Sequence, residues 1–354
     1  MKKWVLFLLA IVLILGVAQR PVQAVSFKDV STSHGFHDEI KYLSDKQFIT
    51  GYSDGSFRPE KAVTRGEAAI MIGKAFDLDG TQRTTKFKDV GKSQKASGYI
   101  ASAVEKGIIS GYSNGTFKPE ASISRGEMAI ILSRAFNLSF HSFFRFKDVG
   151  ESTAAFEHIQ RLAAASITAG YPDGTFQPGL SLTRAQFSAF LARGFDVSFK
   201  QKAAIQDSYV RDKTKQYTYQ SSELGREVFT YKKASVWEWM FPEYMWEAHI
   251  VDQDQTYHFF EVESYEGSGI GYPLSEFHES LIYPIKLGAT WTSYTSTSKV
   301  TGIGKKVETP YKTFTNAVEV TSSEGTKTYY VKHVGYVQTI DKGGKVIREL
   351  VDIK

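Results

Sequence analysis

The chain of 354 residues contains no cysteine, which excludes disulfide bonds, thiolate metal sites and cysteine nucleophiles. It therefore also lacks the residue to which a bacterial lipoprotein attaches its lipid. Basic residues exceed acidic ones only slightly, 43 against 38, whereas a nucleic-acid-binding protein normally carries a strong basic excess. No apolar run beyond the N-terminus is long enough to span a bilayer. With 42% hydrophobic residues the chain can form about two packed domains, and its stability must come from that packing.

The first 24 residues have the layout of a secretory signal peptide. Two lysines precede an apolar stretch at residues 4–17, and small residues follow, among them Ala24. The alternative is an uncleaved membrane anchor, but the apolar stretch is shorter than the ~20 residues that a spanning helix needs. We therefore expect cleavage after Ala24, with Ala18 as the second choice. The mature protein would then be secreted, with no membrane contact after cleavage.

Three segments of the chain repeat one pattern at offsets of 60 and 59 residues. Each copy contains Phe-Lys-Asp-Val, then Gly-Tyr 24 residues after the phenylalanine, then an arginine 14 residues after that glycine. The three motifs begin at Phe27, Phe87 and Phe146, at Gly51, Gly111 and Gly170, and at Arg65, Arg125 and Arg184. The constant spacing inside each copy predicts a packed unit, and we assign the units to residues 25–80, 85–140 and 144–199.

Two amphipathic helices are predicted in each repeat. In the first repeat Phe36, Ile40 and Leu43 recur at i, i+4 and i+7, which is typical of a helix. After Gly-Tyr comes Asp-Gly or Asn-Gly, a dipeptide that tolerates the positive φ of a tight turn. The second helix opens with Thr-Arg-Gly-Glu or an equivalent, which fits a capping box in all three copies. Because one helix pair cannot bury its apolar faces alone, we expect the six helices to pack into one domain.

These motifs resemble the S-layer homology domain, a triplicated cell-surface module of bacteria. The resemblance covers residues 25–199, where Phe-x-Asp-Val, Gly-Tyr-x-Asp-Gly-x-Phe-x-Pro and Thr-Arg-Gly-Glu occur in order three times, with departures. It implies a pseudo-three-fold helical assembly and non-covalent docking onto a pyruvylated secondary cell-wall polysaccharide of a Gram-positive bacterium. Gln186 replaces glutamate in the third copy and Asn114 replaces aspartate in the second, while Gly66 and Gly126 replace a common alanine. These departures bear most on a third binding site.

The repeated arginine stands at the first position of the second helix, where a cation meets the positive end of the helix dipole. A residue placed three times against this rule needs a partner. A carboxylate ligand would offset the repulsion between the arginine and the helix N-terminus, because free helix amides and a guanidinium group both favour anions. The alternative is an intramolecular ion pair with the aspartate of Phe-Lys-Asp-Val. Both roles are compatible with the sequence.

The predicted carbohydrate-binding residues come from the repeated motifs. The tyrosines could stack on a sugar or simply pack, and the glycines are expected to cap the first helix and to let the backbone approach a ligand. The set comprises Arg65, Arg125, Arg184, Asp29, Asp89, Asp148, Glu67, Glu127, Gly51, Gly111, Gly170, Tyr52, Tyr112 and Tyr171.

The composition changes after residue 199. Residues 200–216 are polar and are interpreted as a linker or an exposed helix, and short alternating or β-branched runs within residues 217–354 predict an antiparallel β-rich domain of about seven to nine strands. This half is loosely similar to uncharacterised β-rich modules of Gram-positive extracytoplasmic proteins, which implies no activity or ligand. The predicted fold class is therefore multidomain, an all-α-dominated pseudo-three-fold repeat domain followed by an antiparallel β-rich domain.

No catalytic, metal or cofactor site is predicted in the second half. His249, Asp252, Asp254, His258, Glu261 and Glu263 form a short acidic and histidine-bearing cluster, but on a strand i and i+3 point to opposite faces, so we expect polar outer-face residues. Residues 267–271 are interpreted as a flexible glycine-rich turn. Glu238, Glu243 and Glu247 lie near Trp237, Trp239 and Trp246. Carboxylates beside tryptophans favour the alternative function, a wall-anchored hydrolase acting on glycan or peptide. We expect a non-enzymatic surface protein instead, because no set of nucleophile, base and orienting residue is found in this half.

Overall fold

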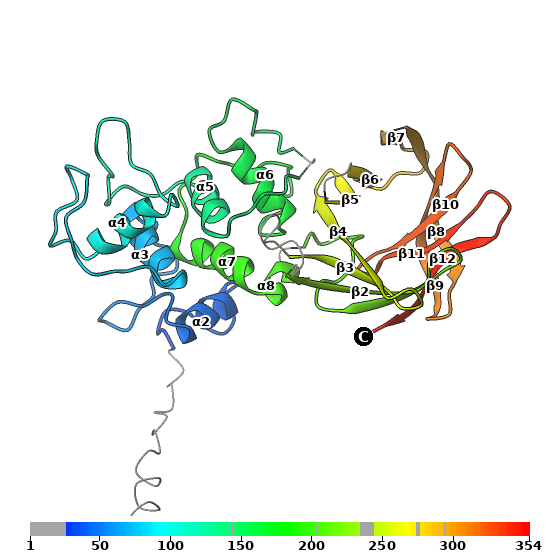
Figure 1. Ribbon diagram of the computed structural model, residues 1–354, viewed down its shortest axis with the longest axis horizontal. Helices are drawn as coiled ribbons and strands as arrows, with labels where there is room; N and C mark the ends of the chain where they lie inside the picture. The colour runs from blue at the N-terminus through cyan, green and yellow to red at the C-terminus, as the bar shows by residue number, and fades with distance from the viewer. Residues whose placement is uncertain (1–25, 143–144, 203, 234–243, 274–276, 294) are drawn as a thin grey trace, which may run out of the picture.

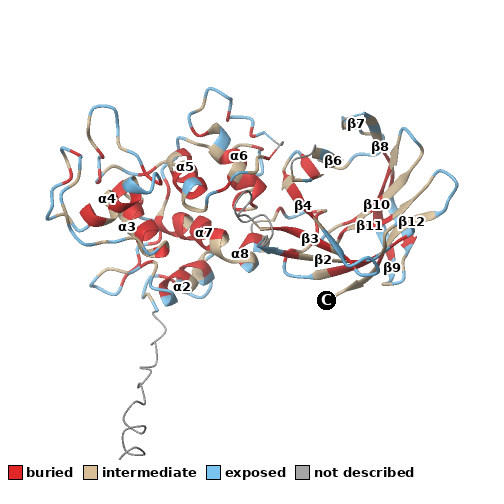
Figure 2. Cartoon of the chain, viewed as in Figure 1, coloured by how far each residue is buried: buried red, intermediate tan, exposed pale blue. Residues whose placement is uncertain are grey.

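The computed structural model describes residues 26–142, 145–202, 204–233, 244–273, 277–293 and 295–354. Helices form one lobe and strands the other (Figure 1). Each lobe has its own core, and buried residues lie on the inward faces of both the helices and the strands (Figure 2). The predicted signal peptide lies outside the described residues. Within the described part of the chain, no helix is both long and apolar enough to cross a bilayer.

Among its described residues, the repeat lobe contains the six predicted helices and one more. The first helices of the repeats are α2 (His37–Asp45), α4 (Ser97–Glu105) and α6 (Phe156–Ala164), and the second are α3 (Arg65–Ala75), α5 (Arg125–Ala135) and α7 (Arg184–Phe195), followed by α8 (Val197–Lys202). The three predicted capping boxes are confirmed, since each hydroxyl at the N-cap accepts from the third amide and the Glu or Gln side chain returns to the cap amide.

A pseudo-three-fold axis relates the repeats. The second helix of each repeat packs on the first helix of the next, so that α3 meets α4, α5 meets α6 and α7 meets α2. Three isolated β-bridges close a ring near the second-helix N-termini, between Ala62 and Thr183, Thr64 and Ser122, and Ser124 and Ser181. At the other end of those helices the rings of Phe76, Phe136 and Phe195 meet with centroids 5.0 to 5.4 Å apart. The three repeats therefore bury one common core.

The expectation of an all-α-dominated architecture is overstated. The helices of the repeats have only 9 to 12 residues, and turns supply much of each unit. One reason is the motif aspartate, because both carboxylate oxygens of Asp29 accept backbone amides, those of Phe57 and Arg58, each at 2.7 Å. Such bonds satisfy loop amides without helix, and the predicted positive φ at Gly55 is confirmed at 80°.

In the second lobe the described residues form one antiparallel sheet of twelve strands, more than the predicted seven to nine. The order across the sheet is β6-β5-β4-β3-β2-β1-β12-β11-β10-β9-β8-β7. The sheet curls, so that the edge strands meet where the amide of Glu279 donates to Ser293 Oγ at 2.9 Å (Figure 1). The strands are β1 (Gln216–Ser221), β2 (Gly225–Lys233), β3 (Tyr244–Ile250), β4 (Gln255–Ser264), β5 (Gly267–Gly271), β6 (Phe277–Ile282), β7 (Thr290–Ser293), β8 (Ser296–Glu308), β9 (Thr313–Ser322), β10 (Lys327–Val331), β11 (Gly335–Ile340) and β12 (Val346–Ile353).

Two predictions about this half are wrong. The glycine-rich run is strand β5 and not a flexible turn, because Gly269 lets the ring of Phe277 approach where a Cβ would lie 2.2 Å from the ring carbon Cζ. Nor is the segment before β1 an exposed helix or a free linker, since Arg211 and Lys213 are buried.

The two lobes touch directly. Helix α6 packs on β4, and the ring of Phe140 stacks on Phe260 with centroids 3.7 Å apart.

Candidate functional site

The three repeated arginines cross the boundaries between repeats. The Nε atom of Arg65 donates to the carbonyl of Phe117 in the next repeat at 2.9 Å, and Arg125 donates to Phe176 at 2.7 Å. Arg184 completes the ring by donating to Phe57 of the first repeat at 2.9 Å. The capping box fixes each arginine at the first turn of its helix, from which the side chain reaches the neighbouring loop.

At every boundary between repeats, hydrogen bonds connect the motif aspartate, the loop phenylalanine and the arginine in that order. The carboxylate of the motif aspartate holds the amide of the loop phenylalanine, and the carbonyl of that same phenylalanine accepts from the arginine of another repeat. Burial opposes ionisation of Asp29 and Asp89, but the backbone amides outweigh it and lower the pKa of both carboxyls. The alternative of an ion pair between the arginine and the motif aspartate is wrong, because the described residues contain no such pair.

The acidic partner is instead the glutamate of the neighbouring capping box. Arg65 Nη1 lies 2.7 Å from Glu127 Oε1, and Arg184 Nη1 lies 4.0 Å from Glu67 Oε1. Gln186 occupies the equivalent position in the third repeat, so the Arg125 boundary has no carboxylate there.

The three guanidinium groups are consequently paired to different degrees, although all are 5 to 6% exposed. Arg65 Nη2 also donates to the carbonyl of Ser110, and Arg184 Nη2 to that of Thr50. For Arg125 the only hydrogen bond among the described residues is the one from Nε. Burial lowers the pKa of Arg125, and it also lowers that of the neighbouring Arg193, on which the charge of Arg125 acts in the same direction. This boundary therefore holds the least compensated positive charge of the three.

The tyrosines lie beside the arginines. The guanidinium carbon of Arg65 is 4.8 Å from the ring centroid of Tyr112, that of Arg125 is 4.7 Å from Tyr171 and that of Arg184 is 5.1 Å from Tyr52. The hydroxyls of Tyr52 and Tyr112 donate to the capping-box glutamates Glu67 and Glu127. Tyr112 is 38% exposed, so part of its ring faces solvent.

Hydrogen bonds also hold the glutamate of the first repeat in its charged form. Burial opposes ionisation of Glu67, but donation from Lys61 Nζ at 2.8 Å, from the amide of Thr64 and from the hydroxyl of Tyr52 outweighs it and lowers the pKa.

The glycines do not cap the first helices, which is a correction to the prediction. The helix α2 ends at Asp45, and the residue with positive φ after it is Gln47. Gly51 instead lies against the ring of Phe27, where an added Cβ would be 2.5 Å from Cε1, and Gly111 and Gly170 lie in the same way against the motif phenylalanines. The close approach that these glycines permit is to an aromatic ring of the same repeat.

One boundary encloses a cleft of about 130 Å³ between the first and second repeats. Arg65, Gly111, Tyr112 and Glu127 line it, so the structure brings these four predicted residues together, whereas Asp89 lies behind them and holds the loop. The cleft is also lined by Arg134, which the sequence analysis missed. The sequence does carry a signal for it, since an arginine occurs nine residues after both Arg125 and Arg184. A cleft with cations, an aromatic face and a carboxylate can hold an acidic or hydroxylated ligand.

Comparison with known proteins identifies these units. Residues 26–69, 86–129 and 145–188 match the family model of the S-layer homology domain. The chain carries three S-layer homology repeats. Cell surface glycoprotein 1 of Acetivibrio thermocellus is 32% identical over 43% of this chain and 7% of its own length. The Cellulosome-anchoring protein of the same organism is 37% identical over 32% of this chain and 26% of its own length. S-layer protein EA1 of Bacillus anthracis is 33% identical over 49% of this chain and 20% of its own length. The chain thus spans at most about a quarter of the length of these relatives.

The histidine-bearing cluster of the β domain is divided among separate partners. His258 Nε2 lies 3.3 Å from Glu247 Oε2, Glu261 pairs with Arg211, and Glu263 accepts from the hydroxyl of Tyr283 at 2.6 Å. His258 and Glu261 are buried, so the expectation of outer-face residues is wrong for them. No group of three or more potential ligands in the described part of the chain is arranged to hold a metal ion.

Of the tryptophan and glutamate region, Trp246 and Glu247 lie among the described residues. Trp237, Glu238, Trp239 and Glu243 lie outside the described residues. Trp246 is fully buried and packs in the core of the β domain, so it offers no face to a sugar.

Proposed function

We propose that the three S-layer homology repeats anchor the protein non-covalently to the cell surface of a Gram-positive bacterium by binding a pyruvylated secondary cell-wall polysaccharide. The names of the relatives support a cell-surface role, since one is an anchoring protein and another an S-layer protein. The β domain would then be displayed outward as a non-enzymatic module.

The observation that carries the polysaccharide proposal is the incompletely paired Arg125. Its Nη1 and Nη2 atoms lack protein hydrogen-bond partners in the described residues. At the position where the other two boundaries have the capping-box glutamate, this boundary has Gln186. A carboxylate on a sugar would supply the missing acceptor as a two-point contact with the guanidinium group, and the ring of Tyr171 would lie beside the sugar. The boundary with Gln186, which by sequence alone is the weakest candidate, is by charge the best one for an anion.

The test is co-sedimentation of the mature chain with purified cell walls, before and after chemical removal of the secondary polysaccharide. We expect binding to untreated walls and loss of binding to stripped walls. Retention on stripped walls at the same level would contradict the proposal, since the polysaccharide would then not be the receptor.

The variant Arg125→Met tests the site itself. We expect wall affinity to fall by about tenfold or more, because one charge-assisted contact is lost from a buried position. Arg145→Met is the matched control, since Arg145 is 62% exposed and Glu151 is its ion-pair partner in the described part of the chain. Equal wall binding by the two variants would assign the contact elsewhere.

The non-enzymatic role of the β domain is tested separately. Purified walls are incubated with the mature chain, and the released reducing ends and free amino groups are measured. We expect no release above that of a boiled sample. A release that saturates with substrate would instead support a wall-anchored hydrolase.

A further inference from the structure

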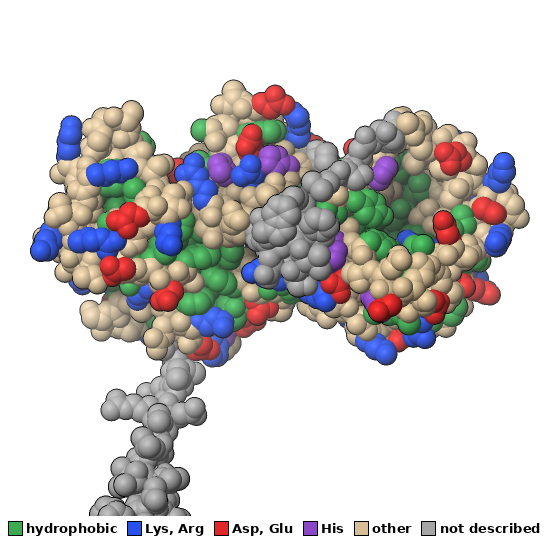
Figure 3. Space-filling view, in the orientation of Figure 1, with side chains coloured by type: hydrophobic (Ala, Val, Ile, Leu, Met, Phe, Trp, Pro, Cys, Tyr) green, Lys and Arg blue, Asp and Glu red, His purple; other side chains and the backbone are tan. Residues whose placement is uncertain are grey.

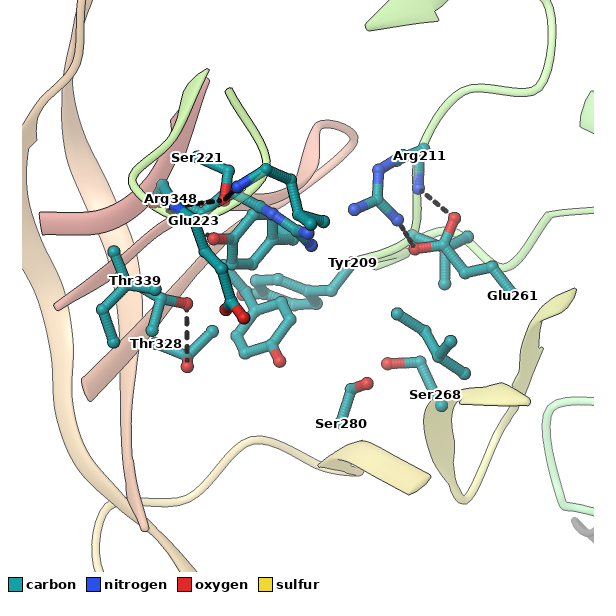
Figure 4. Close-up of a pocket in the computed structure, with 17 residues that line it drawn as sticks. Tyr209, Arg211, Ser221, Glu223, Glu261, Ser268, Ser280, Thr328, Thr339 and Arg348 are labelled. Carbon is teal, nitrogen blue, oxygen red and sulfur yellow. Dashed lines mark hydrogen bonds and ion pairs between the residues drawn. The ribbon is translucent and has the colours of Figure 1, made fainter. Parts of the chain in front are cut away.

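The curled sheet of the β domain encloses a cavity of about 330 Å³ that none of the predicted sites includes. This lies within the range of small-molecule sites, about 300–1,000 Å³. Its walls come from β4, β5 and β6 on one side and from β1, β10, β11 and β12 on the other, with residues 209–211 between them (Figure 4). The β domain is visibly hollowed on the face shown in Figure 3. The cavity reaches the surface beside Glu223, an exposed residue of the β1–β2 turn that lines it.

A buried arginine, Arg211, lines the cavity. Arg211 is 2% exposed, and its Nη1 atom lies 2.7 Å from Glu261 Oε1 while its Nε donates to the hydroxyl of Tyr219 at 3.1 Å. Five aromatic rings have centroids within 6 Å of its guanidinium carbon, those of Tyr219, Phe229, Trp246, Phe259 and Tyr336. Burial opposes the charged form of Arg211, but the attraction by Glu261 together with the contributions of Tyr219 and Tyr217 outweighs it, so the pKa of Arg211 is raised and the group stays charged. The side chain is therefore held in one position before any ligand arrives.

One nitrogen of this arginine remains available. Nη2 of Arg211 has no hydrogen-bond partner in the described part of the chain, and Figure 4 shows it directed away from Glu261, toward the opposite wall. The hydroxyl of Tyr209, another lining residue, likewise has no partner among the described residues. Buried or half-buried donors without partners are rare, and such donors facing a cavity are the means by which a polar ligand is oriented.

The remaining walls combine hydroxyls with aromatic faces. Ser268 and Ser280 lie on one side, and the hydrogen-bonded pair Thr328 and Thr339 lies on the other, with Oγ1 atoms 3.2 Å apart (Figure 4). Tyr330 and Tyr336 also line the cavity. An apolar ligand would leave Nη2 of Arg211 and the hydroxyl of Tyr209 without a hydrogen-bond partner, which is unfavourable.

Both cations of the lining are already paired with a carboxylate. Arg211 pairs with Glu261 and Arg348 Nε lies 2.8 Å from the buried Glu227, while the remaining anion of the lining, Glu223, is exposed to solvent. A charged ligand would add an uncompensated charge inside the sheet, at a cost that a neutral ligand avoids. We propose that this cavity binds a neutral, hydroxyl-rich small molecule of about monosaccharide size.

The test uses saturation-transfer NMR on the mature full-length chain with four probes, the neutral sugars glucose and N-acetylglucosamine, anionic glucuronate and cationic glucosamine. The charged probes are measured on the variant Arg125→Met, in which the anion site proposed for the repeats is removed. We expect at least one neutral probe to bind with a dissociation constant on the order of 1 mM and both charged probes to bind this variant about tenfold more weakly. The proposal is overturned if neither neutral probe binds, or if a charged probe binds the variant as tightly as the neutral ones do.

Two variants locate the binding in the cavity and not in the repeats. Thr339→Phe fills the cavity from β11, and its matched control is Thr315→Phe at an exposed position of β9 in the same sheet. We expect the first to abolish saturation transfer and the second to leave it unchanged. Persistence of the signal in Thr339→Phe would assign the binding to another surface. Should that variant fold poorly by near-ultraviolet circular dichroism, Tyr209→Phe decides, since loss of one unpaired donor is expected to weaken binding about threefold to tenfold and an unchanged affinity contradicts the proposal.

Discussion

The three boundary arginines can be compared with one another, because they occupy equivalent positions in the repeats but make different numbers of hydrogen bonds and ion pairs. Arg65 donates to two carbonyls and to Glu127, whereas Arg125 donates to one carbonyl. A hydrogen bond to a charged group contributes about 1.5–3 kcal/mol, and the apolar methionine side chain recovers part of the loss because a buried charge is removed. We therefore expect Arg65→Met to lower the free energy of unfolding by roughly 3–5 kcal/mol and Arg125→Met by roughly 1–2 kcal/mol. Arg184→Met should fall between them, since its contact with Glu67 is 4.0 Å long.

Differential scanning calorimetry of residues 25–354 and of the three variants measures this order. A difference of about 2–3 kcal/mol in a unit of this size corresponds to about 4–12 °C in melting temperature. We expect the repeat-domain transition of Arg65→Met to lie below that of Arg125→Met by this amount, while the β-domain transition stays in place. Coincident transitions of the two variants, or the reverse order, would refute the argument that unequal pairing sets the stability of the boundaries.

Three further predictions concern packing, pH and the buried pair. Gly51→Ala should destabilise the repeats by about 1–3 kcal/mol because its Cβ meets a phenylalanine ring, while Gly35→Ala, with no atom within 4 Å, should be neutral in urea unfolding. The carboxyl of Asp89 has a lowered pKa, so its contribution is present above about pH 4, the unfolded value, and is lost as the pH falls through the folded one. Asp89→Asn should flatten the melting temperature between about pH 3 and 5, and an unchanged slope would contradict this. Arg211→Leu should cost about 3–5 kcal/mol by leaving Glu261 buried and unpaired, and adding Glu261→Leu should recover part of it in thermal melts, whereas no recovery would locate the cost in the aromatic packing.

The local parts of the fold were predictable because their signals are short in sequence. A capping box spans four residues, and Thr64 with Glu67 defines the start of α3 without any knowledge of the rest of the chain. The offsets of 60 and 59 residues likewise predict three equivalent units. The β domain was predicted in class but not in strand number, because β5 consists largely of glycine and serine and has no alternating pattern.

The candidate site was predictable in its residues but not in its pairing. The arginines, tyrosines and glutamates were all selected from the repeat, yet the acidic partner of Arg65 is Glu127 and not a motif aspartate. This partner depends on how one repeat is rotated against the next, and a sequence without that rotation cannot choose between two nearby carboxylates.

The sequence by itself determined that the chain contains three helical repeats and a separate β-rich half, because each rests on periodicity or composition within tens of residues. Only the tertiary structure decided that Arg184 reaches Phe57, 127 positions away, that the Nη atoms of Arg125 have no hydrogen-bond partner among the described residues, and that Arg211 from an apparently polar linker is buried in the curled sheet. Contacts of this range depend on the closure of the ring of repeats and on the curvature of the sheet, which arise from packing of all the elements together and have no local signal.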